Sequence, residues 1–161
     1  MVNINEPDKV PMEQARLGRV AELLGGYKIL HKYPKSPLEA HEMLLRGLPS
    51  KALTHFVDNF VILRWDAAFE KAVGMSQRTY QRYSTATSRL LSLEQAARTW
   101  KLAAIVARAT DVFGSREEAE RWLEEPAIGL NQRRPIDLLA TPAGVELVES
   151  FLDRIDYGVY T

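Results

Sequence analysis

A short polar stretch in the middle of the chain holds side chains suited to contact with a nucleic acid. They are Ser76, Gln77, Arg78, Thr79, Gln81 and Arg82. On a helix in the major groove, glutamine and arginine can hydrogen-bond base edges, and arginine, serine and threonine can bond phosphate oxygens. Gly74 can take a turn at little steric cost. Residues 65–83 therefore predict a helix-turn-helix, with Met75, Tyr80 and Tyr83 packed inward.

The charge distribution favours the same interpretation. Residues 71–108 contain seven Lys or Arg residues and one Glu, whereas residues 116–161 contain five Arg and ten Asp or Glu residues. Attraction to phosphates makes a basic face useful for DNA binding. Two alternatives stay open. The arginines are solvated on a helical hairpin used for dimerisation, or the charges cluster by chance on solvated helix faces.

The last five residues form a second group with binding chemistry. The group is Tyr157, Gly158, Val159, Tyr160 and Thr161, and Arg154 stands just before it. Tyrosines offer rigid contact area and a hydroxyl, glycine permits close approach, and the planar guanidinium of Arg154 can bind a carboxylate. An apolar, aromatic end of this kind predicts a segment that docks into a partner. The alternative is that it packs back onto its own core.

Patterns that would indicate an enzyme are missing from the sequence. There is no cysteine, and His31, His41 and His55 do not pair at the spacing of a helical zinc site. No glycine-rich phosphate loop or nucleophile elbow occurs. Asp153 and Asp156 stand near each other, but we expect both to be solvated. The sequence thus predicts a binding protein that is not an enzyme and has no metal or cofactor.

The composition and the chain start predict where the protein works. The chain is 46% hydrophobic and 26% charged, which is typical of a soluble globular protein. No window approaches the ~18 apolar residues of a membrane span. The first residues lack the basic start and apolar core of a signal peptide. We expect a cytoplasmic protein with no membrane partner.

Helices must position the two groups, because no segment shows the alternation typical of a strand. A serine followed three residues later by Glu or Gln predicts helix starts at Ser36, Ser92 and Ser115, and Ser50 is another candidate cap. The longest predicted helix, 93–112, is the expected spine of the fold. The predicted helices span 12–24, 37–46, 51–63, 65–73, 76–84, 93–112, 116–124 and 142–155, and the segment 125–141 is rich in loops.

The C-terminal third carries an ordered series of motifs. The series is Phe113-Gly114, Ala119-x-x-Trp122-Leu123-x-x-Pro126, Pro135-x-Asp137-Leu138-Leu139, Thr141-x-x-Gly144 and Arg154-Ile155-x-Tyr157-Gly158-Val159-Tyr160. It resembles the toxin-binding domain of the Xre/MbcA/ParS class of type II antitoxins. The resemblance extends from about residue 47 to the end of the chain. It includes Ser76-x-Arg78-Thr79, which is similar to the entry to that family's second helix.

The resemblance implies an antitoxin that binds a co-encoded toxin and, with it, represses its own operon. In the closest subgroup the toxin is a RES-domain protein with an ADP-ribosyltransferase-like fold, which consumes NAD or transfers from it. The family's C-terminal end enters or covers the toxin's active-site cleft, which assigns toxin contact to Arg154 and residues 157–161. Its N-terminal domain dimerises and binds operator DNA, so a homodimer or higher oligomer is expected.

The implied fold class is all-α, with an N-terminal helical domain that contains the helix-turn-helix and a small helical toxin-binding domain after it. We expect a flexible arm over 1–11, the helix-turn-helix and dimerisation domain over 12–91, and the toxin-binding domain over 92–161. Two other functions stay open. One is a free-standing helix-turn-helix transcription regulator whose C-terminal domain serves oligomerisation, and the other is a helical scaffold without a role at DNA.

Apolar periodicity also predicts the core of the C-terminal third. Its expected members are Trp122, Leu123, Pro135, Leu138 and Leu139. The role of the neighbouring Arg133 and Arg134 stays open, because the pattern fits both a toxin interface and a solvated loop.

Overall fold

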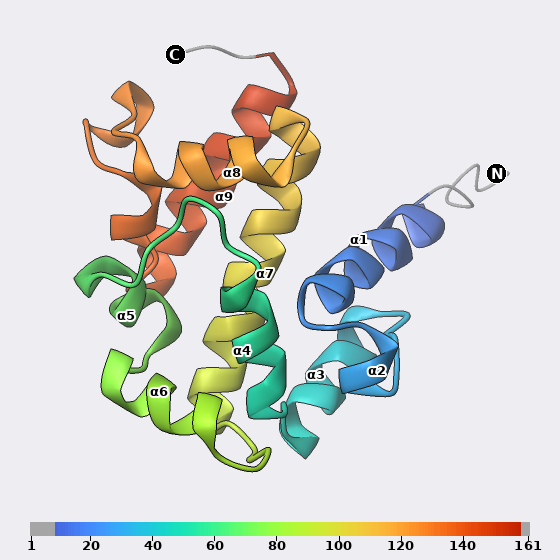
Figure 1. Ribbon diagram of the computed structural model, residues 1–161. Helices are drawn as coiled ribbons and strands as arrows, with labels where there is room; N and C mark the ends of the chain where they lie inside the picture. Colours follow the sequence, from blue (N-terminus) through green and yellow to red (C-terminus); the bar gives the residue numbers. More distant parts are fainter. Residues whose placement is uncertain (1–8, 159–161) are drawn as a thin grey trace, which may run out of the picture.

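A helix of 21 residues, α7 (Leu93–Phe113), runs through the middle of the molecule (Figure 1). This computed structural model describes residues 9–158. Ser92 begins α7 with the predicted capping box: its hydroxyl accepts from the N–H of Gln95, and the Gln95 side chain accepts from the N–H of Ser92. Since α1, α3, α5, α8 and α9 all pack against α7, the predicted spine of the fold is confirmed.

Helices make up all the regular structure of the described residues, so the predicted all-α class is confirmed. Besides α7 they are α1 (Lys9–Leu23), α2 (Tyr27–Leu30), α3 (Pro37–Arg46), α4 (Ser50–Asp58), α5 (Ala67–Val73), α6 (Gln77–Thr85), α8 (Arg116–Glu124) and α9 (Pro142–Asp156). Two short 3-10 turns, η1 (Ile128–Leu130) and η2 (Pro135–Leu138), lie between α8 and α9.

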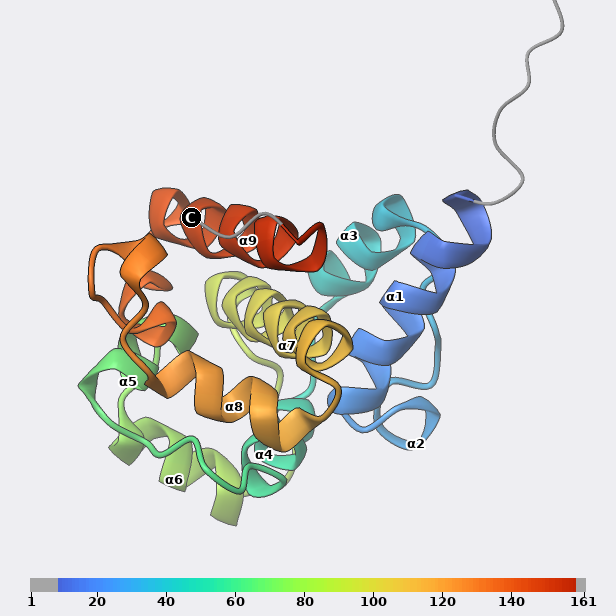
Figure 2. The same ribbon diagram turned by 90° about the horizontal axis from the view of Figure 1, so that it is seen from above.

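The other helices surround α7. Seen along the direction of Figure 2, α8 and α9 lie on different sides of α7, and α1 and α3 lie on a third side. The short helix α6 packs on α4 and lies towards the N-terminal end of α7 (Figure 1). The C-terminal end of α9 lies towards the opposite end of α7 (Figure 1). The predicted DNA-contacting helix α6 and the C-terminal end of α9 therefore lie towards opposite ends of α7.

One hydrophobic cluster joins the helices before α7 with those after it. Its fully buried members include Phe56, Phe69, Val106, Leu123 and Leu152. Burying a side chain of this size contributes about 1.5–3 kcal/mol to stability. Because the cluster contains residues from α4, α5, α7, α8 and α9, the two predicted domains share one interior.

The predicted core of the C-terminal third is confirmed. Leu123, Pro135 and Leu139 are buried. Trp122 and Leu138 are half-buried and pack against the cluster. The ring of Trp122 lies between Phe113 and Phe151, with centroid distances of 5.3 and 6.1 Å.

Several predicted helix ends are wrong. The predicted helix 51–63 ends at Asp58, because the N–H groups of residues 61–63 bond a distant carboxylate described below instead of continuing the helix. The short helix α2 was not predicted. The first helix begins at Lys9, so it includes the last part of the predicted arm 1–11, whose residues 1–8 lie outside the described range.

Ser50 is not the helix cap that the sequence predicts. Pro49 holds the capping position of α4 and makes no side-chain bond there. Ser50 is buried, and its hydroxyl accepts from the N–H of Arg89 at 3.0 Å. The serine therefore joins the start of α4 to the segment after α6.

A single methyl group at Gly144 should test the packing of η2 against α9. The N–H of Gly144 donates to the Thr141 hydroxyl at 3.1 Å, and a Cβ at this position would overlap the carbonyl oxygen of Leu138. Gly144→Ala should lower the free energy of unfolding by about 1–3 kcal/mol, because the backbone must shift to admit the methyl. Chemical denaturation measures this change.

The matched control is Gly18→Ala within α1. A Cβ at Gly18 would meet no atom within 4 Å. Alanine is favoured over glycine in a helix by roughly 0.5–1 kcal/mol, so this variant should be more stable than the wild type. A Gly144→Ala protein as stable as the wild type would contradict the close approach of the two backbones.

Candidate functional site

The predicted helix-turn-helix is present as α5, a tight turn and α6. Asp66 caps α5, and its carboxylate accepts from the N–H of Phe69 at 2.9 Å. Gly74 ends α5 with φ of 69°, a conformation that costs glycine little. Met75 is 5% exposed and packs into the core as predicted. Ser76 then caps α6 by accepting from the N–H of Thr79.

The inner face of α6 is fixed by an aromatic contact. The ring of Tyr80 stacks on Trp65 with centroids 4.5 Å apart, and its hydroxyl donates to Asp58 at 3.2 Å. Burial and the neighbouring charge of Asp58 raise the pKa of Tyr80 well above its usual value. Tyr83 is also half-buried against the core. The prediction that both tyrosines face inward is confirmed.

The outer face of α6 is exposed. Gln77, Arg78, Gln81 and Arg82 are all exposed. Neither Arg78 nor Arg82 makes an ion pair within residues 9–158. The structure thus presents four of the six predicted DNA-contacting residues on one helix face.

The other two predicted residues are used within the helix cap. The Ser76 hydroxyl accepts from the N–H of Thr79 at 3.2 Å and donates to the Thr79 hydroxyl at 3.0 Å. Thr79 is half-buried. Their hydroxyl groups hold the start of α6 and are less free for an outside contact than the neighbouring side chains.

Glu70 positions α6, a role that the sequence analysis did not identify. Its carboxylate accepts from the N–H of Gln77 at 2.8 Å and from the indole N–H of Trp65 at 3.3 Å. It therefore holds the first residue of α6 against α5 and fixes the angle between the two helices. Only the fold reveals this role, because an acid in the first helix has several possible partners.

The end of α9 points away from the core. Arg154 is exposed and makes no ion pair within the described chain. Tyr157 follows the last turn and is 80% exposed, and Gly158 is exposed. The alternative that the end packs back onto its own core is therefore wrong for Tyr157 and Gly158. The predicted residues Val159, Tyr160 and Thr161 lie outside the described residues.

Apolar side chains continue this exposed surface along α9. Leu147 is 55% exposed, and Phe151 and Arg154 follow it at four and seven residues, on the same helix face. The ring of Phe151 lies against Gly129 of η1, next to Ile128, which is 81% exposed. We call Ile128, Leu147 and Phe151 the apolar strip. The sequence analysis missed it, although the helical spacing of the last two was a usable signal.

The predicted solvated pair, Asp153 and Asp156, has a partner. The two carboxylates accept from one nitrogen of Arg108, Nη2, at 3.1 and 2.8 Å. The prediction that both are solvated agrees with their side-chain exposures of 58% and 42%, but the helical register of α9 also points both towards Arg108 of α7. This ion pair fixes the last turns of α9 on α7 and leaves Arg154 on the opposite, outward side.

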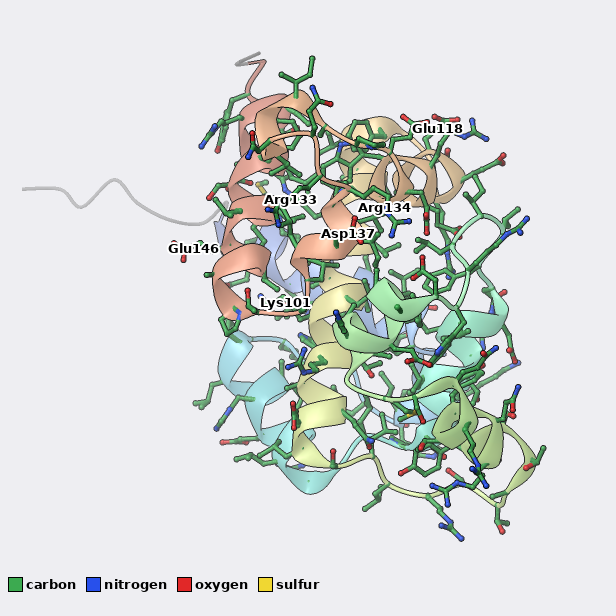
Figure 3. The ribbon with its side chains drawn as sticks, turned by 90° about the vertical axis from the view of Figure 1, so that its left-hand side faces the viewer. Lys101, Glu118, Arg133, Arg134, Asp137 and Glu146 are labelled. Atoms are coloured by element: carbon green, nitrogen blue, oxygen red, sulfur yellow. The ribbon has the colours of Figure 1, made fainter. Side chains whose placement is uncertain are left out.

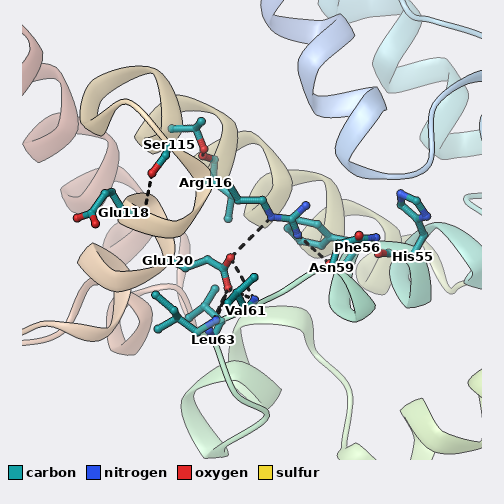
Figure 4. A network of polar contacts seen from close by, with 12 residues as sticks. His55, Phe56, Asn59, Val61, Leu63, Ser115, Arg116, Glu118 and Glu120 are labelled. Carbon is teal, nitrogen blue, oxygen red and sulfur yellow. Dashed lines mark hydrogen bonds and ion pairs between the residues drawn. The ribbon is translucent and has the colours of Figure 1, made fainter.

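A buried carboxylate connects α8 to the segment before the helix-turn-helix. The side chain of Glu120 is 0% exposed. It accepts from the N–H groups of Val61, Ile62 and Leu63, each at 3.0 Å (Figure 4). Arg116 lies 3.8 Å from it, and burial lowers the pKa of this arginine while Glu120 opposes the shift. The carboxylate thus satisfies three backbone donors that no helix or sheet uses.

A second ionic link ends on the cap of α5. Arg134 donates to Asp137 at 2.8 and 2.9 Å and to Glu124 at 2.8 Å (Figure 3). It also reaches Asp66, the cap of α5, at 3.5 Å. Its hydrogen bonds hold the pKa of Asp137 below the usual value, whereas burial raises the pKa of Glu124 despite Arg134. Of the two arginines left open, Arg134 is structural and Arg133 stays exposed.

Two family models match the chain, and each covers one of these regions. The antitoxin Xre-like helix-turn-helix domain matches residues 39–104, and the antitoxin Xre/MbcA/ParS C-terminal toxin-binding domain matches residues 108–158. The chain belongs to the family of Xre-type antitoxins. The family assignment made from the sequence motifs is thus confirmed. The two matches meet within α7, whereas the predicted division falls after residue 91, and this division stays a prediction.

A curated relative agrees with this family. The protein "Antitoxin Xre" of Yersinia enterocolitica is 29% identical to this chain over 92 residues. The alignment covers 56% of the present chain and 62% of the relative. The chain therefore spans less than two thirds of the length of that antitoxin.

No group of three or more potential metal ligands occurs within 9–158. The three histidines are all exposed. In the same range, no helix is long and apolar enough to cross a membrane.

Removing the buried carboxylate should destabilise the protein strongly. In Glu120→Ala, the N–H groups of residues 61–63 lose their acceptor and Arg116 loses its ion-pair partner. Removing one partner of a buried charge pair costs about 3–5 kcal/mol. Glu120→Gln keeps an acceptor oxygen and should lose less. Urea unfolding at neutral pH measures both changes.

Glu118 is the matched control on the same helix. Its side chain is 52% exposed and pairs with Arg121 at 3.0 Å, so Glu118→Ala should cost less than about 1 kcal/mol. If Glu120→Ala and Glu118→Ala unfolded at the same urea concentration, the hydrogen bonds from residues 61–63 to Glu120 would not contribute to the free energy of unfolding.

Proposed function

We propose that this Xre-family protein is an antitoxin that neutralises a RES-type toxin by blocking its active site with the segment after α9. The toxin would be an NAD-consuming protein of ADP-ribosyltransferase-like fold. With the toxin bound, the antitoxin would repress its own operon through α6. The observation that carries the proposal is the exposed end of α9 within a family of toxin-binding domains.

The residues at this end have the properties of a binding hot spot. Tyrosine and arginine are the side chains most often found at the energetic centre of an interface. Tyr157 is 80% exposed, so it has little packing within the described chain to lose when it enters a cleft. Arg154 has no ion-pair partner in the described chain. Its guanidinium can therefore hydrogen-bond polar groups, such as carboxylates, that a site for NAD needs. We therefore assign toxin contact to Arg154 and residues 157–161.

The apolar strip supports a contact wider than the tail. Ile128 and Leu147 are 81% and 55% exposed, and large exposed side chains that gather in one place often mark an interface. They adjoin Phe151, which precedes Arg154 by one helical turn. A partner that binds residues 157–161 would thus also cover the outer face of α9.

The arrangement of the molecule is compatible with simultaneous binding of toxin and DNA. The exposed face of α6 and the C-terminal end of α9 lie towards opposite ends of α7 (Figure 1). This separation is compatible with repression by the toxin–antitoxin complex.

Dimerisation is part of the proposal. Leu38 and Leu45, seven residues apart on α3, are 66% and 57% exposed. Two leucines at this spacing lie on one face of the helix. They offer an apolar surface for a second copy, away from both α6 and the end of α9 (Figure 1).

Shortening the chain tests the occlusion mechanism. A variant that ends at Asp156 should keep its thermal stability, because Tyr157 and Gly158 are exposed, and should fail to protect cells that express the toxin. Tyr157→Ala alone should weaken toxin binding roughly 30-fold or more, as expected for a hot-spot residue. Binding to the purified toxin and cell growth are the measurements.

Tyr27→Ala is the matched control, because Tyr27 is also exposed, at 64%, and lies on α2 far from α9 (Figure 1). It should bind the toxin as the wild type does. Full protection by the shortened chain would exclude occlusion by residues 157–161. A full-length protein that neither binds nor neutralises the toxin would favour the free-standing regulator, whose C-terminal domain serves oligomerisation.

The role of α6 at DNA has a separate test. The double variant Arg78→Ala, Arg82→Ala should fold normally, since both side chains are exposed, and should lose at least tenfold in affinity for the operon's promoter duplex. Gel-shift or anisotropy titration at a fixed, stated salt concentration measures the loss. Unchanged affinity would remove the helix-turn-helix from the proposed function. A wild-type protein that does not bind the duplex would leave a helical scaffold without a role at DNA.

A further inference from the structure

A small hollow lies between the C-terminal end of α6 and the segment that follows it. Its volume is about 310 Å³. It is lined by Arg82, Tyr83, Thr85, Ala86 and Arg89. Two positive charges therefore face one hollow that no carboxylate lines. The volume is ample for a phosphate group.

The two arginines have no ionic partner in the described chain. Most arginines outside this region do: Arg19 pairs with Asp111 at 2.6 Å, and Arg108 and Arg134 each bond more than one carboxylate. Neither Arg82 nor Arg89 makes such a pair with residues 9–158. Two arginines that line one hollow without a carboxylate partner suit it to an anion from outside.

The backbone of Arg89 is held firmly in place. Its N–H donates to the Ser50 hydroxyl at 3.0 Å, and its carbonyl accepts from the Ser50 N–H at 2.6 Å. Two residues later, the N–H of Leu91 donates to the Leu48 carbonyl at 2.9 Å. These bonds tie the segment after α6 to the start of α4. The backbone of Arg89 is therefore already ordered before binding, and this lowers the conformational entropy that is lost when its side chain binds a ligand.

We propose that Arg82 and Arg89 together bind a backbone phosphate of the DNA that α6 enters. The inference rests on the proposed DNA binding and assigns different contacts to the two ends of α6. Arg78 near the start of the helix contacts bases, and the hollow at the end of the helix binds a phosphate. The helix has nine residues, a length of roughly 13 Å. The major groove is about 12 Å wide, so a helix that crosses it brings its end to the phosphate backbone.

A phosphate contact and a base contact differ in two measurable ways. Each neutralised phosphate adds about 0.9 to the slope of log affinity against log salt concentration. A phosphate contact strengthens binding to all sequences alike, whereas a base contact strengthens only the specific sequence. Arg89 is decisive here, because it lies outside α6 and cannot be explained as part of the recognition helix.

The experiment uses the full chain and two duplexes, the promoter of its operon and a scrambled duplex of equal length. The variants are Arg89→Ala, the double variant Arg82→Ala, Arg89→Ala, and Arg78→Ala, with affinity measured from 50 to 200 mM KCl. Arg133→Ala is the control. Arg133 is exposed and lies between η1 and η2, away from α6 (Figure 3), so this variant should bind DNA as the wild type does.

We expect the double variant to lose about 0.9 in slope and to weaken equally on both duplexes. Arg78→Ala should instead reduce the preference for the promoter. A double variant with the wild-type slope, in a protein that still binds DNA, overturns the phosphate site and leaves the proposed function intact. A wild-type protein that binds neither duplex overturns both. Circular dichroism of each variant confirms that the helices are retained.

Discussion

The carboxylate of Glu120 is the interaction on which the arrangement of the two halves depends. Three consecutive N–H groups, from Val61 to Leu63, leave the helical pattern after α4 and find this single acceptor. A buried N–H without an acceptor is costly, so the segment can follow its path only where α8 supplies the charge. The extended path in turn lets the chain cross from α4 to the start of α5.

Arg134 acts on the same segment from its other end. It joins Glu124 of α8 and Asp137 of η2 to Asp66, which caps α5. Both ends of the segment between α4 and α5 are thus held by residues of the region matched by the toxin-binding family. Contacts made far along the chain thus add to the local contacts of Glu70 and Trp65 that position α5 and α6.

Local signals made much of this fold predictable. Ser92, Ser115 and Gly74 act through neighbours a few residues away, so their caps and turn could be read from the sequence. The exposed α6 residues could also be predicted, because an amphipathic helix leaves its polar face outside. The path of residues 59–66 could not, since an apolar run fits a helix equally well and its acceptor is 57 to 59 positions away. Arg89 was missed for the same reason, because Ser50 fixes it from 39 positions away.

The central position of α7 also limits how such proteins can be rearranged. Both α5, from the helix-turn-helix, and α8, from the C-terminal region, pack against this helix. One continuous hydrophobic cluster extends along it. A gene fusion within this helix would join the N-terminal region of one antitoxin to the C-terminal region of another and would keep every helix. It would still separate Glu120 and Arg134 from the segment between α4 and α5 that they contact. A working chimera of this fold would therefore have to carry both sides of these contacts from the same parent.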